Sequence, residues 1–304
     1  MGQAHSSDVT LGSWWRFPKC HRPVPCSRET KPSRMHSSVT ISQPSTAMNV
    51  VILPHYQAIS AYAADLVCAA LVDEVHPVLG CATGSTPIGL YRELVARDVM
   101  QELAGRLVTF NLDEYIGLDA SHPQSYYAFM HEHLFQPLQL RNRLTHVPNG
   151  MTTDAASTSA EYEELIRKFG GIDLQILGIG RNGHLGFNEP GGSLGSRTRA
   201  QRLSRQTIED NRRFFDRAED VPTSAITMGL GTISEARKLL LLASGKSKAN
   251  AVARALEGPV SSLCPASIIQ MHPDVTLVLD EEAASELRFY HFEGMAEPLD
   301  FSTN

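Results

Sequence analysis

The stretch that decides the fold class runs from residue 172 to residue 190 and reads IDLQILGIGRNGHLGFNEP. Its first six residues form an apolar run that only Asp173 and Gln175 interrupt, and a glycine-rich loop follows at once. Apolar runs of this length are typical of strands that are buried on both faces of a parallel sheet. The stretch therefore predicts a buried strand over 172–177 with a glycine-rich loop at its carboxyl end.

The same pattern recurs along the chain and alternates with amphipathic or capped segments. Further strands are predicted over 49–53, 77–79, 107–111, 238–243 and 274–279. Helices are predicted over 59–71, 87–102, 125–138, 160–169 and 246–257, the second of them capped by Thr86. This alternation favours an α/β fold, a doubly wound and mainly parallel sheet with helices on both faces in a Rossmann-like three-layer arrangement.

The composition is that of an ordinary globular protein. The chain has 304 residues, a formal net charge of −6 and 42% apolar residues. These values exclude a wholly disordered or collagen-like chain, and the mild negative charge argues against general binding to nucleic acid or to a membrane surface. Five scattered cysteines indicate reduced thiols, so we expect a cytoplasmic location.

The first part of the chain differs from the rest. Residues 1–47 are rich in Ser and Pro and carry six Lys or Arg against two acidic residues. We expect this leader to be disordered, or to be wrongly assigned to the protein, because Met35 and Met48 could both be start sites. An organelle transit peptide is the alternative. One domain is expected over 48–290, followed by a tail over 291–304.

Ligands of such folds bind beyond the carboxyl ends of the strands, so the loops there are the candidate site. The loop over 80–87 is small, rich in Gly and hydroxyl groups, and leads into a helix, which makes it a natural anion site. Asp113 and Glu114 follow the next strand, and only one of two adjacent side chains is expected to face a site. The loop over 178–190 carries His184 and Glu189.

Two nucleotide motifs can be rejected. The loop over 80–87 lacks the Gly-Lys-Ser/Thr ending of a Walker A loop. Gly178, Gly180 and Gly183 have the spacing of a dinucleotide fingerprint, but Pro190 follows soon and the required acid is absent over 197–207. What remains is a phosphate-binding loop, a carboxylate base and a His/Glu pair, which suits proton transfer on a small phosphorylated sugar.

Five motifs then carry a resemblance to a known family. They are GCATGSTP at 80–87, NLDEY at 111–115, GIGRNGHLGFNEP at 178–190, SRTR at 196–199 and NRRFF at 211–215. In this order they resemble the glucosamine/galactosamine-6-phosphate isomerase family over about residues 48–290. The resemblance implies a deaminase that converts glucosamine 6-phosphate and water to fructose 6-phosphate and ammonia, with no cofactor and no metal.

The resemblance also implies roles for individual residues. Asp113 matches the base that moves a proton between C2 and C1, and His184 with Glu189 matches the pair that opens the sugar ring. Asn182 matches a further member of the ring-opening group. The positions that match phosphate contacts are Thr83, Gly84, Ser85, Thr86, Arg213 and Lys248.

Several alternatives stay open from the sequence. A galactosamine-6-phosphate deaminase/isomerase, a 6-phosphogluconolactonase-like hydrolase and a non-catalytic sugar-phosphate sensor would use related folds. The expected partner is an amino-sugar phosphate, with neither nucleic acid nor membrane, and assembly into a homo-oligomer is left open. Gly192 and Gln201 replace side chains of the family's second sugar-phosphate site, so we expect no activation by N-acetylglucosamine 6-phosphate.

Overall fold

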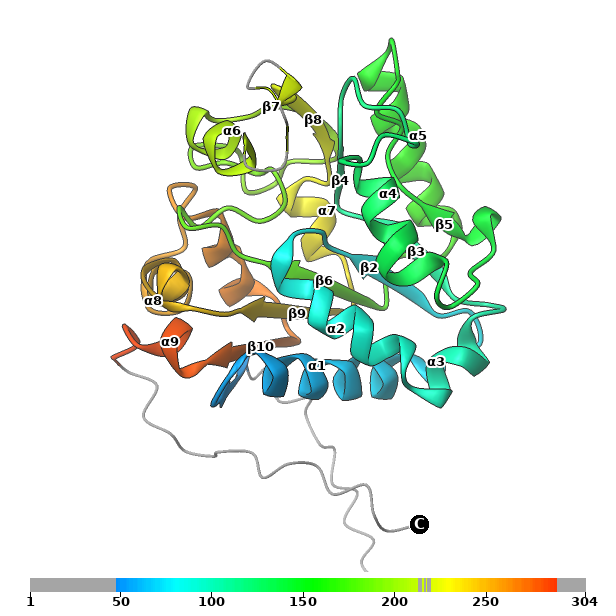
Figure 1. The fold of residues 1–304 in the computed structure, drawn as a ribbon. Helices are drawn as coiled ribbons and strands as arrows, with labels where there is room; N and C mark the ends of the chain where they lie inside the picture. The colour runs from blue at the N-terminus through cyan, green and yellow to red at the C-terminus, as the bar shows by residue number, and fades with distance from the viewer. Residues whose placement is uncertain (1–47, 213–214, 216, 218–219, 289–304) are drawn as a thin grey trace, which may run out of the picture. The chain divides into compact units, whose positions relative to one another are not determined.

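The computed structural model describes residues 48–212, 215, 217 and 220–288 (Figure 1). Within them, the main sheet consists of β1 (Met48–Leu53), β2 (Val78–Cys81), β3 (Val108–Asn111), β5 (Thr145–His146), β6 (Leu174–Gly178), β9 (Lys238–Ala243) and β10 (Val275–Asp280). Their order across the sheet is β1-β10-β9-β6-β2-β3-β5, and every neighbouring pair is parallel.

The strand order confirms the predicted doubly wound α/β fold. From β2 the chain winds outward through β3 to β5, and it then returns to β6, on the other side of β2, and winds through β9 to β10. The winding direction therefore reverses between β2 and β6, which is where open α/β sheets bind their ligands. The connecting helices include α1 (Tyr56–Leu71), α2 (Ser85–Val95), α3 (Asp98–Leu103), α5 (Ala155–Lys168), α8 (Ala249–Glu257) and α9 (Glu281–Ala284).

Apolar side chains at helical and strand spacing form the main core. In α1, Ile59, Ala63, Val67 and Leu71 are buried and share one helix face, which packs with α2 against the sheet. In β9, every residue after Lys238 is buried, as expected of a strand covered on both faces. No helix in the described part of the chain is long and apolar enough to cross a membrane.

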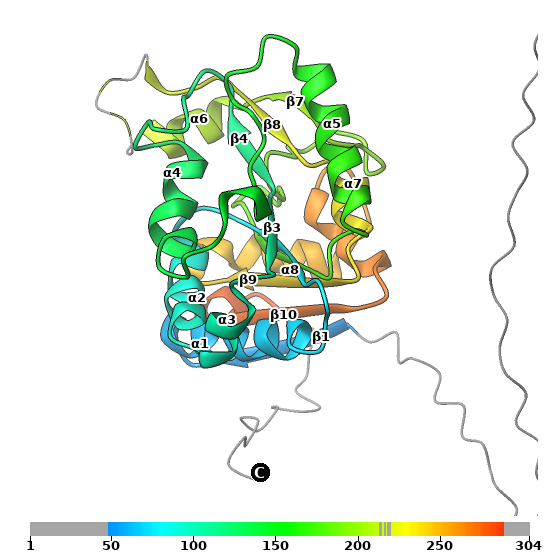
Figure 2. The ribbon, with the colours of Figure 1, turned by 90° about the vertical axis from the view of Figure 1, so that its right-hand side faces the viewer.

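A second, smaller sheet was not predicted. It consists of β4 (Asp113–Tyr115), β8 (Ser224–Thr227) and β7 (Arg199–Arg202), all antiparallel. Both views place it at one end of the main sheet, beside α6 (Arg205–Asn211) (Figures 1 and 2). The prediction missed it because β7 reads RAQR and has no apolar run, so it forms a strand only by pairing with β8.

Several predicted helices differ from those observed, and α5 begins at Ala155 rather than at residue 160. Gly84, with φ of 97°, and not Thr86, is the N-cap of α2, because the preceding loop turns through a left-handed residue. The helix expected over 87–102 is two helices, since Arg97 adopts an extended conformation and forms ion pairs with Asp65 and Glu93. The helix expected over 125–138 is α4 (Tyr126–Met130) followed by a π-helical turn. The helix expected over 246–257 begins with a short 3₁₀ turn, which precedes α8.

A buried carboxylate connects α5 to the chain around the smaller sheet. Glu163 accepts hydrogen bonds from the backbone N–H of Thr198 at 2.8 Å, from the hydroxyls of Thr198 and Thr232, and from Arg197. Burial alone would raise the pKa of Glu163, but these donors outweigh it and lower the pKa below its usual value. Because Thr232 lies in α7 (Leu230–Ser234), this one carboxylate joins three separate segments.

The variant Glu163→Gln should lower the free energy of unfolding by roughly 2 kcal/mol, because a charged acceptor of four hydrogen bonds is lost from a buried position. Denaturant unfolding measures this. The matched control is Glu164→Gln, whose side chain is 67% exposed and pairs with Arg167, and it should change the free energy by less than about 0.5 kcal/mol. Equal stabilities of the two variants would contradict the connecting role of Glu163.

Candidate active site

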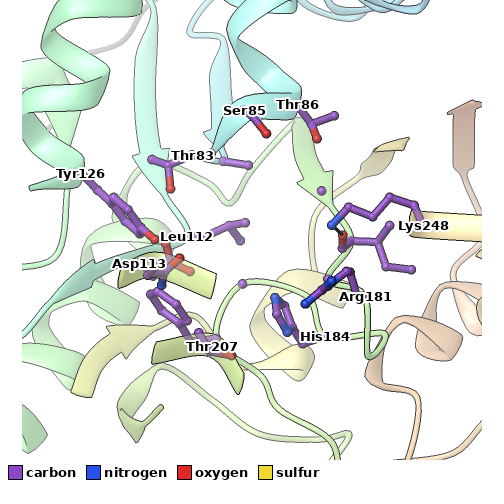
Figure 3. Close-up of a pocket in the computed structure, with 18 of the residues that line it drawn as sticks. Thr83, Ser85, Thr86, Leu112, Asp113, Tyr126, Arg181, His184, Thr207 and Lys248 are labelled. Carbon is purple, nitrogen blue, oxygen red and sulfur yellow. Dashed lines mark hydrogen bonds between the residues drawn. The ribbon is translucent and has the colours of Figure 1, made fainter. Parts of the chain in front are cut away.

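Four loops meet at the carboxyl edge of the main sheet and enclose one cavity. They follow β9, β6, β2 and β3, which are consecutive in the sheet. The cavity has a volume of about 480 Å³, and Figure 3 shows its lining side chains pointing toward a common space. Its polar lining includes Thr83, Ser85, Thr86, Asp113, Tyr126, Arg181, His184, Thr207, Asn211, Ser244, Ser247 and Lys248. All described residues predicted for the site, except Asn182 and Glu189, line this cavity directly.

The loop between β2 and α2 forms one wall of the cavity. Thr83, Gly84, Ser85 and Thr86 all line it, and the free N–H groups of a helix N-terminus lie in this region, where they favour an anion. The buried hydroxyl of Tyr91 holds the start of the loop, because it donates to the carbonyl of Ala82 at 2.5 Å and accepts from its N–H at 3.1 Å.

A second tyrosine fixes the first turn of α2. The hydroxyl of Tyr56, on α1, accepts from the N–H of Gly89 at 2.7 Å and lies 3.0 Å from the carbonyl of Thr86. Across the cavity, Lys248 donates from Nζ to the carbonyl of Ile179 at 2.8 Å and lines the same space (Figure 3). The structure thus places a cation and the loop over 83–86 around the same cavity. Arg213, the other predicted phosphate-binding cation, lies outside the described residues.

Asp113 lies where the chain passes from the main sheet to the smaller one. It begins β4 just after β3 and pairs with Thr227 of β8. The side chain lines the cavity, although the residue is only 5% exposed. A Cβ atom on Gly186 would lie 3.1 Å from its Oδ2, so the loop over 178–190 packs directly on this carboxylate.

The environment of Asp113 favours its protonated form. Burial raises the pKa of Asp113 to about 8, and the negative charge of the neighbouring Glu114 adds to the increase. A carboxyl group with a pKa near neutrality can both accept and return a proton, which is the property required of a catalytic base.

Glu114 points away from the cavity, as predicted for one of two adjacent acids. Its carboxylate accepts hydrogen bonds from the backbone N–H groups of Tyr115, Tyr126 and Tyr127 at 2.8–3.0 Å. Burial raises the pKa of Glu114, and these hydrogen bonds counteract the increase. Glu114 therefore holds the N-terminus of α4, which keeps Tyr126 at the cavity.

The loop after β6 presents His184 to the cavity. The imidazole packs flat over Gly180, where a Cβ atom would lie 2.3 Å from the ring. The N–H of Gly180 donates to the carbonyl of His184 at 3.0 Å and closes the turn between them. Only glycine at position 180 leaves room for the ring in this orientation.

Glu189 lies behind His184, with Asn182 connecting the two. The His184 Nδ1 and Glu189 Oε2 atoms are 3.8 Å apart, an ion-pair distance rather than a hydrogen bond. Asn182 donates from Nδ2 to Glu189 Oε2 at 2.8 Å and accepts the His184 backbone N–H at 3.1 Å. Burial would raise the pKa of Glu189, but the Thr207 hydroxyl, His184 and Asn182 together lower it.

The sequence analysis missed several residues that line the cavity. Arg181 lies within the loop over 178–190, and Ser247 precedes Lys248, so their positions were available although their side chains were not singled out. Tyr126 and Thr207 carried no signal, because each belongs to a helix whose orientation depends on the smaller sheet.

Among the described residues, no three His, Cys, Asp or Glu side chains cluster as metal ligands would.

Comparison with known proteins shows close relatives. A model of the family described as glucosamine-6-phosphate isomerases/6-phosphogluconolactonase matches residues 55–278. The chain is 47% identical to the glucosamine-6-phosphate deaminase of Thermoanaerobacter pseudethanolicus over 239 residues, covering 78% of this chain and 94% of the relative. It is 50% identical to the glucosamine-6-phosphate deaminase of Hahella chejuensis over 246 residues, covering 81% and 94%.

Solved structures agree with these relatives. The structure of a monomeric glucosamine-6-phosphate deaminase matches with a TM-score of 0.76 and 42% identity, covering 79% of this chain and 100% of that one. A 6-phosphogluconolactonase from Trypanosoma cruzi matches with a TM-score of 0.65 and 20% identity, covering 80% of this chain and 98% of that one. At that identity the lactonase shows the fold alone.

The variant Asp113→Asn should be more stable than the wild type at pH 8. Because the folded state raises the pKa of Asp113 from 3.8 to about 8, the wild type loses stability as the pH rises between these values, whereas asparagine does not titrate. Denaturant unfolding should show a difference of at least roughly 2 kcal/mol at pH 8 that shrinks toward pH 4. Asp119→Asn, at an exposed acid, is the control, and its stability difference from the wild type should not grow toward pH 8. A stability difference for Asp113→Asn that does not depend on pH would contradict the raised pKa of Asp113.

Proposed function

The chain belongs to the family of glucosamine-6-phosphate isomerases and 6-phosphogluconolactonases, and we propose that it is a glucosamine-6-phosphate deaminase. The overall reaction converts glucosamine 6-phosphate and water to fructose 6-phosphate and ammonium. The observation that carries the proposal is one cavity lined by the buried acid Asp113, by His184 and by the loop over 83–86. The two deaminases compared above support it, since the match covers 94% of each.

Ring opening is the first proposed step. The bond between C1 and the ring oxygen breaks as the oxygen gains a proton and the anomeric hydroxyl loses one. His184 can deliver this proton, and its Nδ1 lies 3.8 Å from Oε2 of Glu189. Asn182 holds both residues in this arrangement through its two hydrogen bonds.

Proton transfer between carbons is the second step. In the open aldehyde the carbonyl acidifies the proton at C2, and the Asp113 carboxylate removes it and returns it to C1. A proton of the C2 ammonium group passes to the C1 oxygen, so that C1 becomes a hydroxymethyl group and C2 an iminium group. Water then adds to the resulting C2 iminium group, and ammonia leaves the carbinolamine, so atoms and electrons balance without an oxidant or reductant. The raised pKa of Asp113 suits both halves of the transfer.

The phosphate end of the sugar is assigned to the loop over 83–86 together with Lys248. These groups all line the cavity, and they combine helix N–H groups, hydroxyls and an ammonium group. Arg213 remains an expected further contact from the family resemblance. We assign the enzyme to the cytoplasm, supported by the free thiols of Cys68, Cys81 and Cys264.

A coupled ammonia assay with glucosamine 6-phosphate and galactosamine 6-phosphate tests the function and the epimer together. We expect ammonia from the glucosamine compound and, in D₂O, partial deuterium at C1 of the product, because the proton on the Asp113 carboxyl group can exchange with solvent before it is returned. Asp113→Asn should lower turnover by at least about 100-fold while leaving substrate binding nearly intact. Asp119→Asn is the control and should leave turnover unchanged. Hydrolysis of 6-phosphogluconolactone without ammonia release would favour the lactonase alternative instead.

Loss of the Lys248 ammonium group should weaken substrate binding. Lys248→Ala is expected to raise KM by about 10-fold or more, because one charge-assisted hydrogen bond is worth about 1.5–3 kcal/mol. The effect on kcat should be small. Lys246→Ala changes a lysine of the same loop that does not line the cavity and should leave KM unchanged; equal effects of the two would remove Lys248 from the phosphate site.

The glycine under His184 provides a test of ring orientation. Gly180→Ala should lower kcat by roughly 10- to 100-fold, because the new methyl group displaces the imidazole that it would otherwise meet at 2.3 Å. Gly105→Ala is the matched control, since a Cβ atom added there would meet no other atom within 4 Å. Full activity of Gly180→Ala would show that the ring orientation does not matter for turnover.

A further inference from the structure

We infer that Thr207 is a positioning residue for Glu189, so that α6 sets the orientation and charge of a carboxylate on the catalytic loop. The inference rests on the proposed function only for the role of Glu189 in ring opening. Thr207 is 5% exposed and lines the cavity (Figure 3). Its hydroxyl donates a hydrogen bond to Glu189 Oε1, across a separation of 18 residues.

The two oxygens of Glu189 have different partners. Oε2 accepts from Asn182 at 2.8 Å and faces Nδ1 of His184, whereas Oε1 accepts from Thr207. A carboxylate held at one oxygen can still rotate about its last side-chain torsion. With Thr207 holding Oε1, that rotation is blocked and Oε2 stays directed at His184, the titratable group that faces it.

The hydroxyl of Thr207 is itself oriented by a second hydroxyl. Ser204 donates from Oγ to Thr207 Oγ1 at 3.0 Å and accepts the backbone N–H of Thr207 at 3.1 Å, which makes it the N-cap of α6. With its acceptor position filled by Ser204, the Thr207 hydroxyl directs its proton at Glu189. The first turn of α6 must therefore be formed for Glu189 to have this donor.

This contact joins two parts of the fold. Glu189 follows β6 of the main sheet, whereas α6 follows β7 of the smaller sheet and packs through Ile208 on the cluster formed by Tyr115, Phe187 and Leu203. Thr207 is also foremost among the hydrogen-bonding groups that lower the pKa of Glu189 against the effect of its burial. A shift of α6 away from the loop would withdraw the hydroxyls of Thr207 and Ser204, both of which lower the pKa of Glu189, and would favour its protonated form.

The test is an NMR titration of ¹³C-labelled glutamate carboxyl groups in the full chain without substrate, with Glu189 assigned from its missing signal in Glu189→Gln. In Thr207→Val, which keeps the shape of the side chain and removes the hydroxyl, the pKa of Glu189 should rise by about 1 unit. In Thr207→Ser it should stay within about 0.3 units of the wild-type value, because the donor is kept. Thr207→Ala carries the same expectation as the valine variant and replaces it if that variant does not fold.

Turnover provides the second measurement. Thr207→Val should lower kcat by roughly tenfold with KM within about twofold of wild type, and Thr207→Ser should restore kcat. Thr232→Val is the matched control, because it removes a threonine hydroxyl from the distant Glu163 and should leave the pKa of Glu189 unchanged. An unshifted Glu189 in folded Thr207→Val, or a serine variant that behaves like the valine variant, would overturn the inference. Since the titration needs no substrate, failure of the deaminase assay alone would reject the function and not this contact.

Discussion

The cavity of this molecule depends on the carboxyl ends of four parallel strands. Strands β9, β6, β2 and β3 lie side by side, and because they are parallel, all four carboxyl ends meet one edge of the sheet. Neighbouring strands are about 4.8 Å apart, so loops distant in sequence come within reach of one small ligand. The reversal of winding between β2 and β6 separates the helices that follow these strands and leaves room for the cavity between the loops.

Two buried carboxylates in this fold differ in the number of hydrogen-bond donors that they contact, and this difference separates a structural role from a chemical one. Glu163 receives four hydrogen bonds, its pKa is lowered, and it joins segments of the fold. Asp113 is as well buried, but burial and a neighbouring charge raise its pKa to about 8. Glu163, with its four donors, remains a fixed anion, whereas Asp113, which is desolvated without such donors, can exchange a proton in the physiological range.

The smaller sheet gives the site features that the main sheet lacks. Strand β4 carries Asp113 away from the main sheet, and the segment from β7 to α6 brings Thr207 to Glu189. The fold is shared with a lactonase at 20% identity, so the fold by itself does not select the reaction. The chain is 47–50% identical to two deaminases over 239 and 246 residues, so these relatives, and not the fold, point to the reaction.

The sequence by itself determined the α/β class, most strands of the main sheet and the loops that carry Asp113, His184 and Lys248, because continuous apolar runs and the glycines after them are local signals. It also indicated that one of Asp113 and Glu114 would face the site, since adjacent side chains of a strand point to opposite sides. The family resemblance named Asp113 for that role, whereas the tertiary structure alone decided the break between α2 and α3 at Arg97 and the whole smaller sheet. Strand β7 and Thr207 owe their places to partners far away in the sequence, and a polar segment such as RAQR carries no local pattern from which such a pairing could be predicted.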